Sequence, residues 1–189
     1  RAAAARPLPD HPALAPARVT SRAMAIDHDD PALSTLLLPF ATGQLAWPQT
    51  GGALFLRARD GSALRAVAGP GLLCEQSYKP AADALVRSGW RLRTAEETEA
   101  TRFPLVLVLP PRQRQEARAL LARAVVSCAP GGIVVACVAN DDGARSGESD
   151  LKALAGLSGN LSKNHCRVYW STVTAATCDA ALLQNWREG

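Results

Sequence analysis

The sequence predicts an α/β fold built on a doubly wound, mostly parallel sheet. Two continuous apolar runs, at 105–109 and 133–138, are typical of central strands that are covered on both faces. Between them, residues 113–126 place Ala117, Leu120, Leu121 and Ala124 at helical spacing. Strand-like runs alternate with helical patterns along the chain in this way, which is the pattern of a parallel sheet with helices on its faces.

The first element after a proline-rich start is predicted to be a helix. Asp30 is a favourable N-cap, and Pro31 suits the first helical position. Pro39 follows within the same apolar stretch and is expected to end or kink this helix, because proline lacks an N–H and disfavours a helical residue before it.

The remaining elements follow in alternation. Gly89 is expected to end the helix at 80–87. Pro130, Gly131 and Gly132 indicate a turn. We predict strands at 53–57, 72–76, 90–93, 105–109, 133–138 and 167–170, the last continuing toward 173, and helices at 80–87, 113–126, 149–157 and 178–186. Ligands of such sheets bind at the carboxyl ends of the strands, so the chemistry is expected there.

Composition excludes several classes of protein. The 189 residues are 48% hydrophobic and 20% charged, which is typical of a globular chain. No apolar run approaches the ~20 residues that span a bilayer, so no membrane partner is expected. Basic residues exceed acidic ones by 21 to 17, a net charge of +4 that permits a polyanionic partner without requiring one.

The five cysteines do not form a metal or disulfide pattern. Their number is odd, their spacings are wide, and no C-x-x-C or Cys/His zinc motif is present. We therefore expect no metal and reduced thiols packed as small hydrophobic residues in a cytoplasmic protein. A catalytic pair of Cys166 with the adjacent His165 is disfavoured, because neighbours in a strand point to opposite faces.

Three stretches in serial order carry a resemblance to a known family: residues 36–40 (Leu-Leu-Leu-Pro-Phe), 105–111 with the helix that follows, and 140–146 through 161–170. They resemble the N-terminal domain of bacterial ribosomal-RNA guanine-N2 methyltransferases, in the class I S-adenosylmethionine (AdoMet)-dependent superfamily. The resemblance implies a Rossmann-like, degenerate methyltransferase fold. It also implies a C-terminal domain that holds AdoMet and a catalytic Asn-Pro-Pro-aromatic motif.

The composition and the resemblance together predict three parts of the chain. Residues 1–18, with four prolines, are expected to form a flexible arm, and 19–174 the methyltransferase-like domain. Residues 175–189 are expected to form a C-terminal helix or a linker to a missing catalytic domain. Trp186 would then cover the core or face that missing domain.

The positions that the family uses for chemistry depart from its pattern. The loop after the first strand, Arg57 to Gly61, holds one glycine and two arginines where a cofactor loop needs several glycines. Glu75 stands where an acidic residue would hold ribose hydroxyls, although an ordinary exposed carboxylate at a strand end is the simpler interpretation. The fourth strand ends in Leu109-Pro110-Pro111-Arg112, without the Asn or the aromatic ring. We therefore expect no catalytic residue and no cofactor in this fragment.

Basic residues gather near the predicted strand ends. Arg57, Arg59, Lys79 and Arg112 are expected on one rim, where they could contact the phosphates or bases of RNA, or form a solvated basic edge. Lys163, Asn164 and His165 form a second candidate RNA-binding patch, and Arg145 is a similar candidate. The simpler interpretation of His165 and Arg145 is a surface or hydrogen-bonded structural residue. The arginines of the helix at 113–126 are interpreted, with Arg112, as a solvating stripe: Arg114, Arg118 and Arg123.

Together these observations favour a non-catalytic substrate-recognition or scaffold domain of an AdoMet-dependent rRNA guanine-N2 methyltransferase. Its partners would be ribosomal RNA and a C-terminal catalytic domain in cis, and self-association stays open. Two alternatives remain at this point: an active small AdoMet-dependent methyltransferase, and a protein-interaction module.

Overall fold

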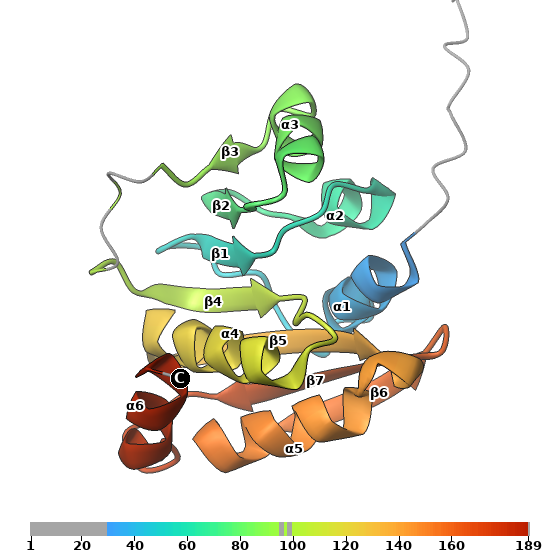
Figure 1. The fold of residues 1–189 in the computed structure, drawn as a ribbon. Coiled ribbons are helices and arrows are strands. Elements are labelled where there is room, and N and C mark those ends of the chain that lie inside the picture. The colour runs from blue at the N-terminus through green and yellow to red at the C-terminus, as the bar shows by residue number, and fades with distance from the viewer. Residues whose placement is uncertain (1–29, 95–96, 98–99, 189) are drawn as a thin grey trace, which may run out of the picture.

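In the computed structural model, which describes residues 30–94, 97 and 100–188, seven strands form one sheet in the order β3-β2-β1-β4-β5-β7-β6 (Figure 1). The neighbours from β3 to β5 are parallel, whereas β7 runs antiparallel to both β5 and β6. The strands are β1 (Ala53–Leu56), β2 (Leu72–Glu75), β3 (Arg91–Leu92), β4 (Phe103–Val108), β5 (Cys128–Ala139), β6 (Gly159–Lys163) and β7 (Cys166–Thr172). The predicted mostly parallel, doubly wound sheet is confirmed.

Helices cover both faces of the sheet, and each face has its own apolar cluster. Leu33 and Leu85 belong to the cluster on the face of α1, α2 and α3, and Leu121 and Leu151 to the cluster beneath α4, α5 and α6. The helices are α1 (Pro31–Ala41), α2 (Ser62–Val67), α3 (Lys79–Arg87), α4 (Arg114–Ser127), α5 (Ala144–Ala155) and α6 (Ala180–Glu188). The predicted flexible arm at 1–18 lies outside the described residues.

Helix α1 begins as predicted but does not end where predicted. The Asp30 carboxylate accepts from the N–H of Ala32 at 3.0 Å and of Leu33 at 3.3 Å, as an N-cap does. The helix then runs through Pro39 to Ala41, so the prediction that this proline ends it is wrong. Burial of the leucine side chains on this helix against the sheet outweighs the single hydrogen bond that Pro39 cannot donate.

The turn predicted at 130–132 is also wrong, because β5 already begins at Cys128. The register shifts between Phe103 and Leu105 of β4, and the extra residues of β5 form a bulge there. The N–H of Gly131 donates to the carbonyl of Val173 at 2.7 Å, which keeps the irregular segment paired. Helix α5 likewise starts earlier than predicted, at Ala144, and α2 and β6 were not predicted as elements.

Among the residues that the structure describes, every helix is too short or too polar to span a bilayer. Within the same ranges, no group of three or more His, Cys, Asp or Glu side chains could hold a metal ion.

Candidate functional site

The carboxyl ends of three adjacent strands meet at one edge of the sheet. Leu56 of β1 is in register with Glu75 of β2 on one side and with Val108 of β4 on the other. Arg57, Gln76 and Leu109 therefore leave the sheet side by side. This is the place where ligands of parallel sheets bind.

The antiparallel β7 brings a further turn to the same edge. Ala139 at the end of β5 is opposite Cys166 at the start of β7. The N–H of Asn140 accordingly donates to the carbonyl of His165 at 2.8 Å. The β5–α5 loop and the β6–β7 turn thus extend the edge beyond the ends of β1, β2 and β4.

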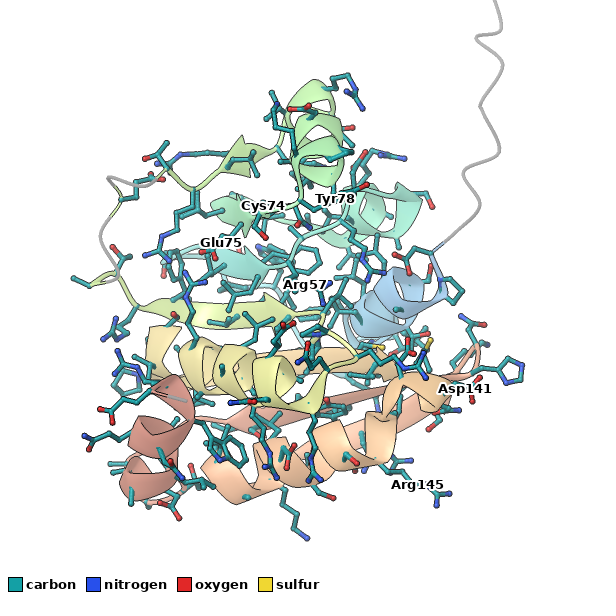
Figure 2. All side chains as sticks on the ribbon, in the orientation of Figure 1. Arg57, Cys74, Glu75, Tyr78, Asp141 and Arg145 are labelled. Carbon is teal, nitrogen blue, oxygen red and sulfur yellow. The ribbon has the colours of Figure 1, made fainter. Side chains whose placement is uncertain are left out.

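Arg57 dominates the centre of this edge. Its backbone lies in the left-handed region, with φ 53°, which is uncommon for a residue with a side chain. Its guanidinium Nη1 donates to the carbonyl oxygen of Leu109 at 3.2 Å, which joins the ends of β1 and β4; Figure 2 labels Arg57. Burial and the neighbouring charge of Arg59 both lower the pKa of Arg57.

The loop that follows Arg57 is held by contacts within the protein. Ala58 is fully buried; its N–H donates to the carbonyl of Glu75 at 2.9 Å, and its carbonyl accepts from the Gln76 amide at 2.8 Å. A Cβ on Gly61 would lie 2.7 Å from a methyl carbon of Leu33 on α1. The one glycine of this loop therefore serves packing against α1.

Asp60 links the same loop to β3 and α3. Its carboxylate accepts from the Ser88 hydroxyl at 2.5 Å and the Trp90 indole at 2.8 Å, and Arg65 contacts it at 2.8 Å. Burial acts to raise the pKa of Asp60, but these hydrogen bonds and the Arg65 charge outweigh burial and hold it below its ordinary value. The loop is thereby fixed at both ends.

Glu75 is engaged by two arginines. Arg123 of α4 contacts both carboxylate oxygens, with its Nη2 at 2.7 Å from Oε2, and the largely buried Arg93 lies 3.7 Å from Oε2. The interpretation of Glu75 as an ordinary exposed carboxylate is therefore wrong. Its two oxygens already hold cations and are not directed at a ligand.

A cavity of about 580 Å³ opens where these residues meet. Its lining includes Arg57, Glu75, Gln76, Ser77, Pro111 and Arg123. A cofactor in this place needs a glycine-rich backbone to approach and a carboxylate to hold hydroxyl groups. Here an arginine side chain stands at the first position and an ion-paired glutamate at the second, so these residues do not fit an AdoMet cradle as they stand.

The strand end after β4 consists of a buried leucine, two prolines and an exposed arginine. The side chain of Leu109 is buried and apolar, and its carbonyl accepts from Arg57. Pro110 and Pro111 lead the backbone into the loop before α4. Arg112 is 81% exposed and lies 3.7 Å from Asp142.

The candidate RNA-binding residues lie along the edge in two separate groups. Around the β1 and β2 ends, Arg59 pairs with Asp30 at 2.6 Å and Lys79 with Asp83 at 2.5 Å. Beyond Arg112, the second group consists of exposed side chains: Arg145, Lys163 and His165. Figure 2 shows this separation: Arg57 and Glu75 lie near β1 and β2, whereas Arg145 and Asp141 lie beside the start of α5.

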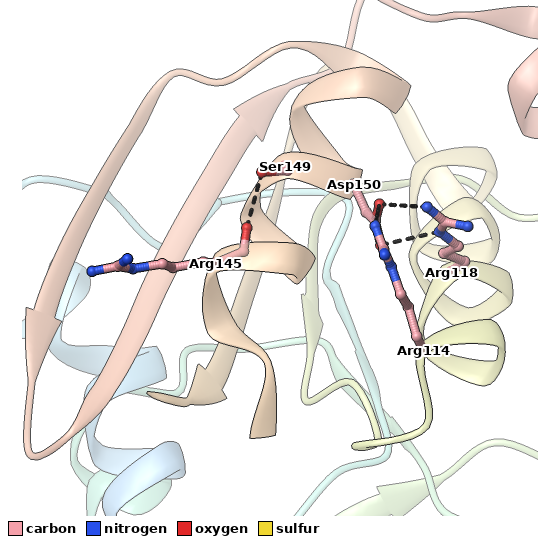
Figure 3. Close-up of polar contacts among 5 residues, drawn as sticks. All are labelled: Arg114, Arg118, Arg145, Ser149 and Asp150. Atoms are coloured by element: carbon pink, nitrogen blue, oxygen red, sulfur yellow. Dashed lines mark hydrogen bonds and ion pairs between the residues drawn. The ribbon is translucent and has the colours of Figure 1, made fainter. Parts of the chain in front are cut away.

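The arginines of α4 are not the solvating stripe that the sequence predicted. Arg114 and Arg118 both donate to Asp150 of α5 at 3.1 Å, and the Asp150 side chain is only 6% exposed (Figure 3). The guanidinium of Arg118 also lies 4.7 Å from the ring centroid of Trp186. These side chains join α4 to α5 and α6, whereas Arg145 points away from the cluster.

Two exposed residues, Tyr78 and Arg187, are further candidates for binding that the sequence analysis did not identify. Tyr78 follows β2 and is 67% exposed, and Arg187 near the end of α6 is also exposed. An aromatic residue directly before Lys79 was the available signal for Tyr78. No local pattern marks Arg187, because its place beside α4 depends on tertiary packing.

The cysteines pack as predicted. Cys74, Cys128, Cys137 and Cys166 are buried free thiols, and Cys178 is half-buried. Burial raises the pKa of Cys74 and of Cys128 to about 12, so neither thiol is a nucleophile near neutral pH.

No protein-family model matches the sequence, and neither does any curated protein. Solved structures do match the fold. The 16S rRNA methyltransferase RsmC of T. thermophilus, in complex with AdoMet and guanosine, matches with a TM-score of 0.64 at 19% identity over 82% of this chain. This chain spans 42% of that protein.

Two shorter proteins match over most of their length. The N-methyltransferase NodS of Bradyrhizobium japonicum, with S-adenosyl-L-homocysteine, has a TM-score of 0.59 at 17% identity, covering 77% of this chain and 89% of NodS. A putative methyltransferase of Haloferax volcanii, in complex with an activator, has a TM-score of 0.57 at 8% identity, covering 76% and 90%. The chain therefore has the Rossmann-like fold of AdoMet-dependent methyltransferases.

Proposed function

We propose that this chain is a non-catalytic domain of methyltransferase fold that binds RNA at the carboxyl edge of its sheet. In this proposal it recognises the substrate for a catalytic rRNA guanine-N2 methyltransferase domain in cis. The observation that carries the proposal is the position of Arg57. This residue directly follows β1 and has a left-handed backbone conformation, and its guanidinium donates a hydrogen bond to the Leu109 carbonyl.

The cofactor position supports this proposal on two independent grounds. Arg57 puts a long side chain where a cofactor would need open backbone, and the Arg57–Leu109 hydrogen bond ties that side chain down. Glu75 is neutralised by Arg123 and Arg93. A ligand would have to displace both arrangements, and each displacement costs free energy.

The catalytic position supports it as well. Leu109 offers no side-chain group that could orient a target amine, and its carbonyl is already an acceptor for Arg57. Arg112 offers no ring on which a base could stack. Both departures lie at one strand end, and none of the described residues that line the cavity is aromatic.

Two observations support RNA as the partner: the arginines along the carboxyl edge of the sheet and the structural similarity to RsmC. Arg57 and Arg112 present guanidinium groups along this edge, and such groups hold phosphates and stack on bases. RsmC is described as acting on 16S rRNA, and this chain spans less than half of its length. A partner domain in cis would supply the chemistry.

One observation favours a second candidate, an active small methyltransferase. The cavity of about 580 Å³ lies at the strand ends, with a carboxylate on the end of β2. NodS, which is matched over 89% of its length, has a fold of similar size. In that case AdoMet would open the Arg57–Leu109 and Arg123–Glu75 contacts when it binds.

A calorimetric titration with AdoMet separates the two candidates. We expect no saturable heat at micromolar protein and up to millimolar AdoMet. In parallel, fluorescence anisotropy at low salt should show binding of labelled RNA, with an affinity that falls steeply as salt rises. Saturable micromolar binding of AdoMet would replace the proposal by the second candidate, and failure of the wild-type chain to bind RNA would overturn the RNA-binding role.

A further inference from the structure

A second cavity of about 610 Å³ adjoins the first along α4. The two cavities share the lining residues Glu116, Leu120 and Arg123, so they adjoin along α4, and we call the two together the α4 groove. It runs from the strand ends at Arg57 to the end of α6 at Arg187.

The α4 groove has a basic border. Four arginines line the two cavities against two glutamates: Arg57, Arg102, Arg123 and Arg187, with Glu75 and Glu116. Arg123 and the adjacent Arg93 share Glu75, so this cluster keeps a net positive charge. Arg187 is exposed and belongs to no ion pair within the described ranges. A chain of phosphates fits this border better than a neutral or basic partner does.

The interior of the groove differs from its border. Ala119, Leu120 and Val126 of α4 form an apolar strip between the arginines. Unpaired bases can lie on such a strip while their phosphates face the guanidinium groups, whereas the bases of a duplex are already stacked and paired. This combination of a basic border and an apolar strip favours a single strand.

An exposed aromatic residue directly follows, in the sequence, a residue that lines the groove. Tyr78 directly follows Ser77, which lines the first cavity, and is 67% exposed. Its backbone N–H donates to the side-chain oxygen of Gln76 at 2.9 Å, and Gln76 in turn donates to Ala58. The ring is therefore mounted on a fixed loop, as a platform for a base must be.

We propose that a single strand of RNA lies in the α4 groove, between the strand ends at Arg57 and the end of α6 at Arg187. The inference rests on the proposed RNA-binding function and specifies where the bound RNA crosses the protein surface. The RNA strand runs from the edge of the β-sheet toward α6 and does not follow that edge toward Arg145 and Lys163.

Two charge reversals on exposed helix positions test this path. Arg187→Glu removes a cation from the α4 groove, and Arg145→Glu is its matched control on α5, remote from the groove. The probe is a fluorescein-labelled single strand of about 12 nucleotides, a length within the usual site sizes of single-strand binders. We expect Arg187→Glu to weaken binding at least about fivefold and to lower the salt slope by about 0.7, the contribution of one phosphate contact on a single strand. Arg145→Glu should change neither quantity.

Each outcome has a separate meaning. If Arg145→Glu weakens RNA binding and Arg187→Glu does not, the RNA strand follows the edge of the β-sheet. The proposed path through the α4 groove is then wrong, while the RNA-binding function stands. A hairpin duplex that competes as well as the single strand would also overturn the path. If the wild-type chain binds neither probe, the proposed function itself fails. Circular dichroism melting confirms that both variants are folded, because both positions lie on helix surfaces.

Discussion

The Arg57 guanidinium donates to the Leu109 carbonyl across the ends of β1 and β4, while the Arg57 backbone stays in the left-handed region. A left-handed conformation costs a residue with a side chain about 1–2 kcal/mol, so the contact must offset that cost. Arginine at this position therefore combines a local strain with a cross-strand bond.

Substitutions of Arg57 separate these two effects. Arg57→Ala loses the hydrogen bond and keeps the strain, and we expect it to lower the free energy of unfolding by about 1–2 kcal/mol. Arg57→Gly also loses the bond but relieves the strain, and should be about 0.5–1 kcal/mol more stable than the alanine variant. Urea denaturation measures both. Equal stability of the two variants would show that the left-handed conformation is not strained.

Gly147 and Tyr169 offer a second test. A Cβ on Gly147 would overlap the Tyr169 hydroxyl, which is buried and has no hydrogen-bond partner among the described residues. Gly147→Ala should destabilise the protein by about 1–3 kcal/mol despite the better helix propensity of alanine. Tyr169→Phe should be neutral or stabilising within about 1 kcal/mol, because it removes an unsatisfied polar group.

The double variant completes this cycle. With the hydroxyl gone, the alanine methyl has room, so Gly147→Ala combined with Tyr169→Phe should recover most of the lost stability. Thermal and urea unfolding of the four proteins give the coupling free energy. Strict additivity of the two changes would mean that the hydroxyl is not what the methyl group meets.

The lowered pKa of Asp60 leads us to expect that the free energy of unfolding depends on pH. The folded state holds its pKa below the ordinary value through Ser88, Trp90 and Arg65. Asp60 therefore contributes stability above its unfolded pKa of about 4, and that contribution is lost as the pH falls through the lower folded value. The difference in unfolding free energy between wild type and Asp60→Asn should be largest near pH 6 and should shrink toward pH 3. A difference that is constant across this range would contradict the prediction.

Tyr78 predicts that binding depends on bases as well as on phosphates. Tyr78→Ala should weaken the binding of single-stranded RNA by about fivefold or more, the effect of one lost base–aromatic stack, while Tyr78→Phe should retain it. Binding of heparin, which has anionic groups and no bases, should be unchanged in both variants. Because the ring is largely exposed, the melting temperature should not move. Equal losses for RNA and heparin would show that Tyr78 acts through the fold.

The order of strands and helices was predictable from the sequence where burial leaves a local pattern. The apolar runs of β4 and β5 lie in the middle of the sheet, and Asp30 caps α1 as expected. Strand β6 was missed because its sequence, Gly-Asn-Leu-Ser-Lys, is polar and lies at an exposed edge, where alternation is weak. Pro39 misled the prediction because tertiary burial of α1 outweighs the local effect of proline.

The candidate site was predictable in position but not in detail. The sheet topology brings Arg57, Glu75 and Leu109 to one edge, and the sequence pattern alone indicates this. The pairing of Glu75 with Arg123 joins residues 48 positions apart, and Arg118 meets Asp150 across two helices. Such pairs depend on how helices pack on the sheet, and no local pattern encodes that arrangement.

The cluster around Asp150 has a consequence for how this protein loses its structure. Arg118 holds the Asp150 carboxylate on one side and lies over the Trp186 ring on the other, and Leu182 and Leu183 of α6 pack on the same apolar cluster. The last helix is thus part of the cooperative folding unit. A boundary drawn before residue 175 would leave an apolar face of α4 in water and would invite aggregation. The smallest fragment that can melt in a single transition includes α6.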